Sequence, residues 1–155
     1  MESAEREGPQ IVAIGSALVT FPHTWRVESS FDDRVVVRSA NGREQATISI
    51  ILLKKALTFE EFSVVCARRV EAEKKGMRDG FIHPDPPAPY KAGEGFRLYY
   101  AGGDKSTHRV FSAYLLHVES EVLTVYLEGL GIPLTEHSET FKTLLSTLKR
   151  RKRSQ

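Results

Sequence analysis

The segment His108–Val118, with the sequence HRVFSAYLLHV, decides the fold of this chain. Large apolar side chains occur at alternating positions along it, with Val110 and Tyr114 on one face and Phe111 and Leu115 on the other. Successive side chains of a β-strand point to opposite faces of the sheet. A strand that is apolar on both faces is typical of the middle of a sheet covered on both sides. We therefore expect a central strand between two helical layers.

Two further apolar runs flank this segment, Phe96–Ala101 before it and Val122–Leu130 after it. The residues between the runs, Gly102–Asp104 and Glu119–Glu121, have the composition of turns. Because short turns join antiparallel strands, we expect a mostly antiparallel sheet.

The N-terminal part contains a second group of expected strands. Asn41-Gly42 separates the valine-rich run Arg34–Ser39 from Glu44–Leu53, whose apolar residues alternate. Asn-Gly is a strong hairpin signal because both central positions of the tight turn need positive φ. Before this hairpin, Ile11–Ile14 and Ala17–Phe21 predict another hairpin or a bulged strand.

Two segments have helical periodicity. Thr58 and Glu61 form the pattern of a capping box, and apolar residues then recur at helical spacing to about Lys75, with Gly76 as the stop. The apolar stripe consists of Phe59, Phe62, Val65, Cys66 and Val70. Thr135 predicts the cap of a second helix. Its stripe consists of His137, Phe141, Leu144, Leu145 and Leu148.

Residues 76–95 hold four of the seven prolines, and we expect a loop or an edge crossing there. The predicted fold class is α+β, with a single central, mostly antiparallel sheet of about six strands and one main helix on each face, an α/β/α sandwich. We divide the chain into a mobile N-terminal lead-in at residues 1–10, a single domain at 11–148 and a basic C-terminal tail at 149–155.

Charge and cysteine content exclude several classes of protein. The 155 residues include 22 Lys and Arg against 20 Asp and Glu, but five of the cations are consecutive, at 149–153. The remaining chain is mildly acidic, which excludes a basic nucleic-acid-binding body. The single cysteine, Cys66, excludes an internal disulfide and a cysteine-rich zinc site. Neither a signal peptide nor a transmembrane segment is recognisable, so we expect a cytoplasmic protein as the chain is given.

No group of residues predicts catalysis, and we assign no catalytic, cofactor-binding or metal-ligating residue. Cys66 lies on the apolar stripe of a helix, where a small core residue belongs. The histidines at positions 23, 83, 108, 117 and 137 are scattered, whereas a metal site needs at least three converging ligands. Asp104, Ser106 and His108 are the residue types of a serine triad, but neighbours in one turn do not adopt that geometry.

The remaining signals are ambiguous. The glycine pairs at 93/95 and 102/103 are not part of a nucleotide-binding motif. The acidic pairs at 32/33 and 60/61 are adjacent in sequence, so on a strand or a helix their side chains point in different directions. Four tyrosines on the expected strands either pack in the core or line an exposed binding groove. They are Tyr99, Tyr100, Tyr114 and Tyr126. The basic tail either attracts nucleic acid or anionic lipid or is a solvated extension of the last helix.

The chain resembles the PsbP-like family, which includes DcrB-like bacterial proteins and the Mog-type Ran-binding factor. The resemblance covers residues 16–148 in order and spacing. It rests on Phe21-Pro22 with Trp25, RSANGREQATISI at 38–50, LTFEEF at 57–62, GFRLYY at 95–100 and the closing helix at 141–148. It implies a central antiparallel sheet between helices and roles in binding other proteins. Similar members include photosystem extrinsic subunits, a Ran-binding import factor, bacterial lipoproteins and chaperones that shield hydrophobic segments of type VI secretion effectors. No functional residue of the family matches a position in this chain.

These observations predict a non-enzymatic, adaptor- or chaperone-like module of the PsbP/DcrB type that binds another protein. The expected binding surface is a sheet face or the edge near residues 81–93, which would meet an apolar or extended segment. The alternative is a small-ligand or metal-binding enzyme on the same sheet, with His83, Asp85 and His108 as its candidate ligands. A third hypothesis is nucleic-acid or membrane binding through the 149–153 cations.

Overall fold

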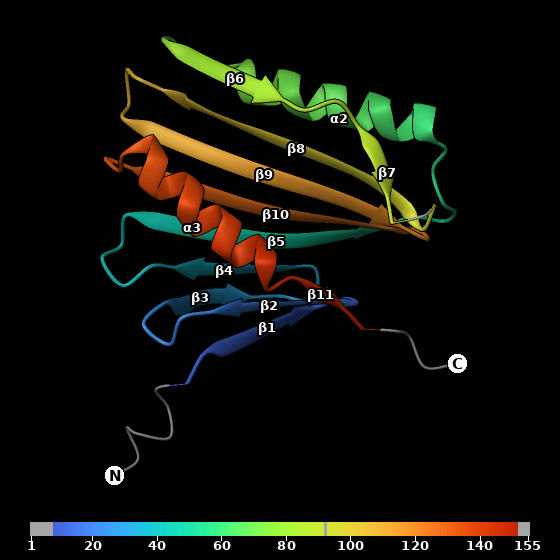
Figure 1. Cartoon of the computed structure of the whole chain (residues 1–155), viewed down its shortest axis with the longest axis horizontal. Coiled ribbons are helices and arrows are strands. Elements are labelled where there is room, and N and C mark those ends of the chain that lie inside the picture. Colours follow the sequence, from blue (N-terminus) through green and yellow to red (C-terminus); the bar gives the residue numbers. More distant parts are fainter. Residues whose placement is uncertain (1–7, 92, 152–155) are drawn as a thin grey trace.

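The structure is a computed structural model that describes residues 8–91 and 93–151 (Figure 1). A small antiparallel sheet has the strand order β1-β2-β11. Its strands are β1 (Gln10–Ile14), β2 (Ala17–Phe21) and β11 (Lys149–Arg150). The predicted lead-in at 1–10 lies outside the described residues up to residue 7, and the predicted tail does so from residue 152.

A second, eight-stranded antiparallel sheet has the order β3-β4-β5-β10-β9-β8-β6, with β7 also pairing with β8. Its strands are β3 (Arg26–Ser30), β4 (Arg34–Arg38), β5 (Glu44–Leu52), β6 (Gly80–Pro84), β7 (Ala88–Tyr90), β8 (Gly95–Asp104), β9 (Arg109–Val118) and β10 (Glu121–Leu130). The helices are α2 (Phe59–Lys74) and α3 (Leu134–Ser146). None of the described helices is long and apolar enough to cross a membrane.

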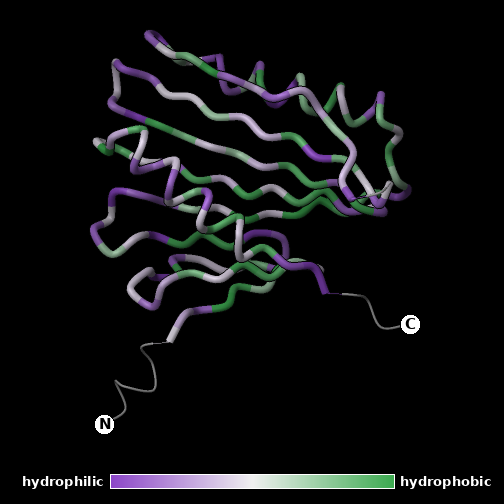
Figure 2. The backbone as a smooth tube through the Cα atoms, viewed as in Figure 1, coloured by the Kyte–Doolittle hydropathy of each residue, from purple (hydrophilic) through white to green (hydrophobic). Residues whose placement is uncertain are grey.

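The two faces of the large sheet have different covers. Helix α2 packs against β6 and β8, and its buried Phe62, Cys66 and Val70 form one core with Leu98 and Phe111. The opposite face is covered by α3 together with the small sheet, as Figure 1 shows. Hydrophobic stretches follow the middle strands in Figure 2, while most turns are hydrophilic. The central strand β9 therefore contributes to both cores, as its two apolar faces predict.

The predicted single six-stranded sheet with one helix on each face is wrong. The first hairpin, β1–β2, is not part of the main sheet and forms a sheet of its own with β11. Strand β3 was not predicted because its residues, RVESS, are mostly exposed and carry no apolar alternation. The proline-rich segment contributes β6 and β7, which pair with β8 at the sheet edge. Proline has no backbone N–H to donate, and an edge strand tolerates this because one of its sides has no partner strand.

The β4–β5 hairpin is confirmed, but its turn differs from the expected tight turn. The amide of Ser39 donates to the carbonyl of Glu44 (2.9 Å), which encloses a four-residue loop. Of the Asn-Gly pair, only Gly42 has positive φ, at 75°. The Asn41 side-chain oxygen instead accepts a hydrogen bond from the Arg43 amide (2.9 Å).

The predicted turn at Gly102–Asp104 is wrong, because β8 continues through these residues and pairs with both β6 and β9. Glycine is required here by close packing. A Cβ on Gly102 would lie 2.2 Å from the carbonyl oxygen of Phe81 and 2.8 Å from the Phe111 ring. The glycines therefore allow β6 to approach β8 instead of ending the strand.

The helix ends agree with the sequence at α2 and differ at α3. The Thr58–Glu61 capping box is present in both directions, and Gly76 follows the helix with φ 87°. Helix α3 instead begins at Leu134 with no side-chain cap, so Thr135 does not cap it. Lys149 and Arg150, expected to continue the helix or fray, form β11.

Candidate binding site

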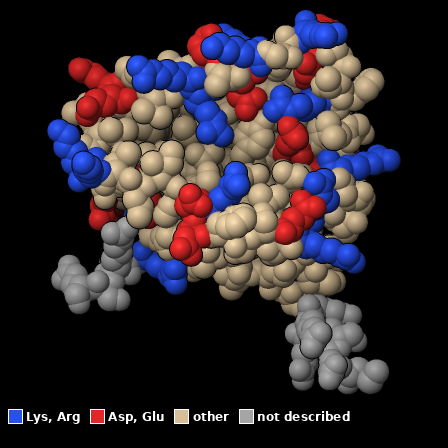
Figure 3. Space-filling model, turned by 180° about the vertical axis from the view of Figure 1, so that it is seen from behind, with Lys and Arg blue, Asp and Glu red and all other residues tan. Residues whose placement is uncertain are grey.

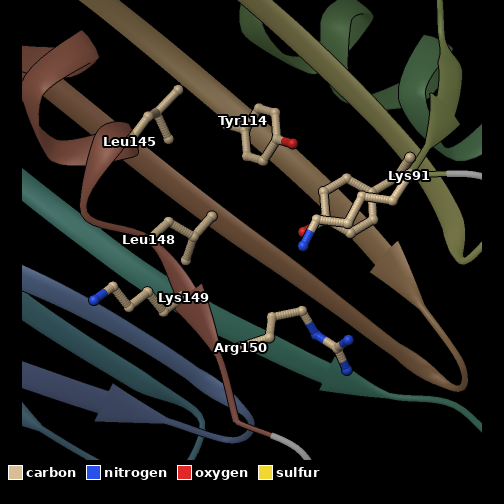
Figure 4. Close-up of a pocket in the computed structure, with 7 residues that line it drawn as sticks. Lys91, Tyr114, Leu145, Leu148, Lys149 and Arg150 are labelled. Carbon is tan, nitrogen blue, oxygen red and sulfur yellow. The ribbon is translucent and has the colours of Figure 1, made fainter.

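A cavity of about 520 Å³ lies on the α3 side of the large sheet, between β11 and the end of β7 (Figure 4). It combines aromatic, aliphatic and cationic side chains. Its lining residues are Tyr90, Lys91, Tyr114, Leu145, Leu148, Lys149 and Arg150. This size is within the roughly 300–1,000 Å³ typical of ligand pockets.

The apolar wall of the cavity is held by the core beneath it. Tyr114 lies on the central strand β9, opposite Tyr99 of β8, whose ring packs on Phe141 of α3 (5.8 Å between centroids). Leu145 lies in the last turn of α3 and Leu148 follows the helix, and both pack partly buried against the core on the α3 side of the sheet. Burial raises the pKa of Tyr114, an effect that the charge of Arg97 partly offsets. The Tyr114 hydroxyl is therefore protonated at neutral pH and can donate a hydrogen bond.

Three cations surround this wall. Lys91 follows β7 in a left-handed conformation (φ 37°), and its Nζ lies 5.4 Å from the centroid of the Tyr90 ring. Lys149 and Arg150 come from β11, and Arg150 Nη2 lies 4.0 Å from Glu119 Oε1. Since Glu119 is largely exposed, this ion pair is weak. The cavity therefore offers positive charge beside an apolar surface.

A second cavity, of about 420 Å³, lies between α2 and the proline-rich segment and is mostly apolar. Its lining includes Cys66, Val70, Leu98, Pro84, Pro86 and Pro87. Burial raises the pKa of the Cys66 thiol to about 12. The thiol is therefore protonated at neutral pH and is a poor nucleophile.

A third cavity, of about 700 Å³, is lined by charges that already pair with one another. Arg109 bonds Glu128 (2.5 Å), Glu73 (3.3 Å) and the Tyr126 hydroxyl (2.5 Å). Burial opposes the charge on Arg109, but these acidic partners raise its pKa overall. Positive and negative side chains alternate over this α2 side of the molecule in Figure 3. Because its guanidinium is engaged by two carboxylates, Arg109 has little capacity to bind an anion.

Sequence reasoning missed a buried Ser–His–Glu arrangement. Ser112 Oγ lies 2.9 Å from His137 Nε2, and His137 Nδ1 lies 3.2 Å from Glu44 Oε2. All three residues are buried, Ser112 and His137 completely, and none lines a cavity described above. The arrangement therefore connects α3 to β9 and β5 and presents no accessible nucleophile.

The serine-triad residue types noted in the sequence have another role. Ser106 Oγ donates directly to Asp104 Oδ1 (2.7 Å), and His108 is exposed in the turn with φ 54°. The Asp104 carboxylate also accepts the amides of Arg78 and Asp79. Its hydrogen bonds, that from Ser106 first, lower the pKa of Asp104. This carboxylate organises the β8–β9 turn and the start of β6.

The candidate metal ligands do not come together as a site. His83 is exposed on β6 with its ring beside Phe81, at 5.6 Å between centroids, and Asp85 lies just beyond this strand. Within residues 8–91 and 93–151, no group of three or more His, Cys, Asp or Glu residues has the geometry to hold a metal ion. His23 is exposed, whereas His117 is buried with hydrogen bonds to both ring nitrogens.

The four tyrosines have separate environments. Tyr100 is completely buried against Phe111, and its pKa is raised to about 12, mainly by burial. Tyr126 joins the Arg109 ion pairs, Tyr99 packs on α3, and only Tyr114 lines the cavity of Figure 4. The sequence did not single out Tyr90, although its position within 81–93 agrees with the expected edge.

The fold has known structural counterparts. The chain is similar to cyanobacterial PsbP (CyanoP) from Synechocystis sp. PCC 6803, with a TM-score of 0.69 and 15% identity over 93% of each chain. It is also similar to a protein of Bacteroides thetaiotaomicron, with a TM-score of 0.57 and 11% identity over 96% of this chain and 50% of the other. No family model matches the chain, and no curated protein matches it in sequence. The chain therefore has a PsbP-like fold, and the comparisons do not single out the DcrB-like branch.

Proposed function

We propose that this protein is a non-enzymatic, adaptor- or chaperone-like module that holds a segment of another protein in the cavity of Figure 4. The observation that carries the proposal is the combination of Tyr114 and Leu148 with three cations in one cavity on the α3 side of the large sheet. Tyrosine and arginine are enriched among the residues that dominate protein interfaces.

The other cavities support this choice by their chemistry. In the Arg109 cavity the charged side chains already form ion pairs with one another. The Cys66 cavity has apolar walls and a protonated thiol. Among the ion pairs of the described residues, only one involves a cation of the Figure 4 cavity, and it joins Arg150 to the exposed Glu119. They therefore retain charge for a partner. The PsbP-like fold agrees with a binding role, since the resemblance implies roles in binding other proteins.

Affinity capture from source-cell lysate with charge-reversal variants tests the proposal. Lys91→Glu and Arg150→Glu change the cavity, and Lys142→Glu is a matched control on the exposed side of α3, where the lysine is 73% exposed. We expect one protein to be retained by the wild type and by Lys142→Glu and to be lost from both cavity variants. Equal retention by all four proteins would show that the cavity is not the binding site.

A further inference from the structure

Strand β11 pairs with β2 along one edge, and no described strand pairs with its other edge, the free edge of β11. The amide of Arg151 donates to the carbonyl of Ser16 (2.7 Å), and Lys149 lies opposite Leu18 in the same ladder. In an antiparallel pair, alternate residues bond to the partner strand and the intervening residues point their N–H and C=O away from it. The backbone groups of Arg150 therefore point away from β2.

This free edge borders the cavity. Arg150 and Lys149 are themselves lining residues, and Figure 4 shows the Arg150 side chain extending from β11 toward the Lys91 side. β11 is the last strand in the order β1-β2-β11, so none of the described strands pairs with its outer side. An exposed strand edge is a template for pairing with another chain.

We propose that the partner segment binds as an added strand on β11 and pairs with the backbone N–H and C=O of Arg150. This inference rests on the proposed function and specifies how the same cavity holds its partner. Main-chain hydrogen bonds give affinity in such strand addition, and alternate side chains give specificity.

The side chains around the edge define the chemistry of the segment. Leu148 and Arg150, two residues apart, point to the same side of the small sheet, while Lys149 points to the other. Apolar residues of an added strand would face Leu148 and Tyr114, and the intervening acidic residues would point to the other side, toward Lys149. The partner is therefore an extended segment of another protein with alternating acidic and apolar residues.

A pair of substitutions at Arg150 separates backbone pairing from charge. Arg150→Gln removes the charge and keeps the N–H, whereas Arg150→Pro removes both. Proline is tolerated in an edge strand when its position points outward, so the pairing of β11 with β2 is retained. The probe is a short, end-capped synthetic peptide of alternating Glu and Val, with a Lys–Val peptide as its control.

We expect the wild type to bind the Glu–Val peptide and not the Lys–Val peptide. Arg150→Pro should bind it about tenfold more weakly than Arg150→Gln, because a desolvated hydrogen bond to the backbone is lost. Equal affinities of the two variants overturn the added strand, and so does a wild type that does not bind the Glu–Val peptide. Inorganic phosphate that displaces the peptide and binds both variants equally would indicate a small-anion site instead.

Hydrogen exchange provides a measurement that does not depend on the folding of Arg150→Pro. In the wild type, the exchange of the Arg150 amide should slow at least tenfold when the Glu–Val peptide is added, since that amide becomes hydrogen-bonded. An unchanged rate overturns the inference. The charge-reversal capture experiment is independent, so partner capture that depends on the cavity would leave the proposed function standing even then.

Discussion

At the scale of single residues, His117 connects two elements through both of its ring nitrogens. Nε2 accepts the amide of Leu57 (2.9 Å), just before α2, and Nδ1 lies 3.0 Å from the carbonyl oxygen of Glu121. These partners assign a proton to Nδ1, which donates it to the Glu121 carbonyl oxygen, while Nε2 acts as the acceptor. His117 therefore fixes the entry of α2 to the end of β9.

Replacing His117 tests this role. His117→Phe keeps an aromatic ring but removes the acceptor of the Leu57 amide and the hydrogen bond from the ring to the Glu121 carbonyl. We expect the free energy of unfolding to fall by about 1–3 kcal/mol, the cost of buried groups that lose a hydrogen bond. Urea denaturation measures the change. The exposed His83→Phe should stay within about 0.5 kcal/mol of the wild type, as is usual for surface substitutions.

A second residue-scale prediction concerns pH. Because hydrogen bonds lower the pKa of Asp104 in the folded state, this carboxylate contributes stability that is complete above its ordinary pKa of 3.8. That stability is lost as the pH falls through the lower, folded-state value. We expect Asp104→Asn to lower the melting temperature most above pH 3.8, with the difference from the wild type shrinking at lower pH. A pH-independent difference would contradict a role of the ionised group.

At the scale of elements, the two helices begin in different ways. Thr58 accepts the amide of Glu61 (3.1 Å), and the Glu61 carboxylate accepts the amide of Thr58 (2.9 Å). We expect Thr58→Ala to destabilise the protein by about 0.5–2 kcal/mol, the usual cost of losing a side-chain cap. Thr135→Ala is the matched control in α3. A comparable loss for both variants in chemical denaturation would contradict the observed capping.

Elements with strong local signals were predictable from the sequence. Helix α2 has a capping box and a terminal glycine, and β9 has apolar residues on both faces, so neither depends on distant contacts to be recognised. Strands β3, β6, β7 and β11 have no such signal. Each forms because a neighbouring strand supplies hydrogen bonds, as Leu18 does for Lys149 across 131 positions of sequence. Local periodicity cannot reveal pairing of this kind.

The candidate site was predictable only in part, for the same reason. The sequence indicated the edge at residues 81–93 and four tyrosines, of which Tyr114 lines the cavity. Lys149 and Arg150 were predicted to belong to a basic tail, either solvated or attracting nucleic acid or anionic lipid, because a run of cations is usually exposed. Their position beside Tyr114 results from the pairing of β11 with β2. The residue types of these two strands do not predict this pairing.

At the scale of the whole molecule, β11 attaches the end of the described chain to its first hairpin. Ending the chain after Leu148 removes the β11 ladder and the hydrogen bond from the Arg151 amide to Ser16. We expect a loss of about 1–4 kcal/mol in the free energy of unfolding, from a few backbone hydrogen bonds at a net 0.5–1.5 each. Lys149→Ala keeps the backbone and should cost much less. Equal stability of the truncated and full-length proteins in calorimetry would contradict a structural role of β11.

The pairing of β2 with β11 also has a consequence for biosynthesis. A ribosome makes β1 and β2 first and β11 last among the described strands, and domains generally acquire structure from the N-terminal end as they are made. The β1–β2 hairpin therefore lacks its third strand until both helices and the whole large sheet have been synthesised. During translation, its unpaired edge is open to other nascent chains. Chaperones that bind exposed strand edges would be needed most during that interval.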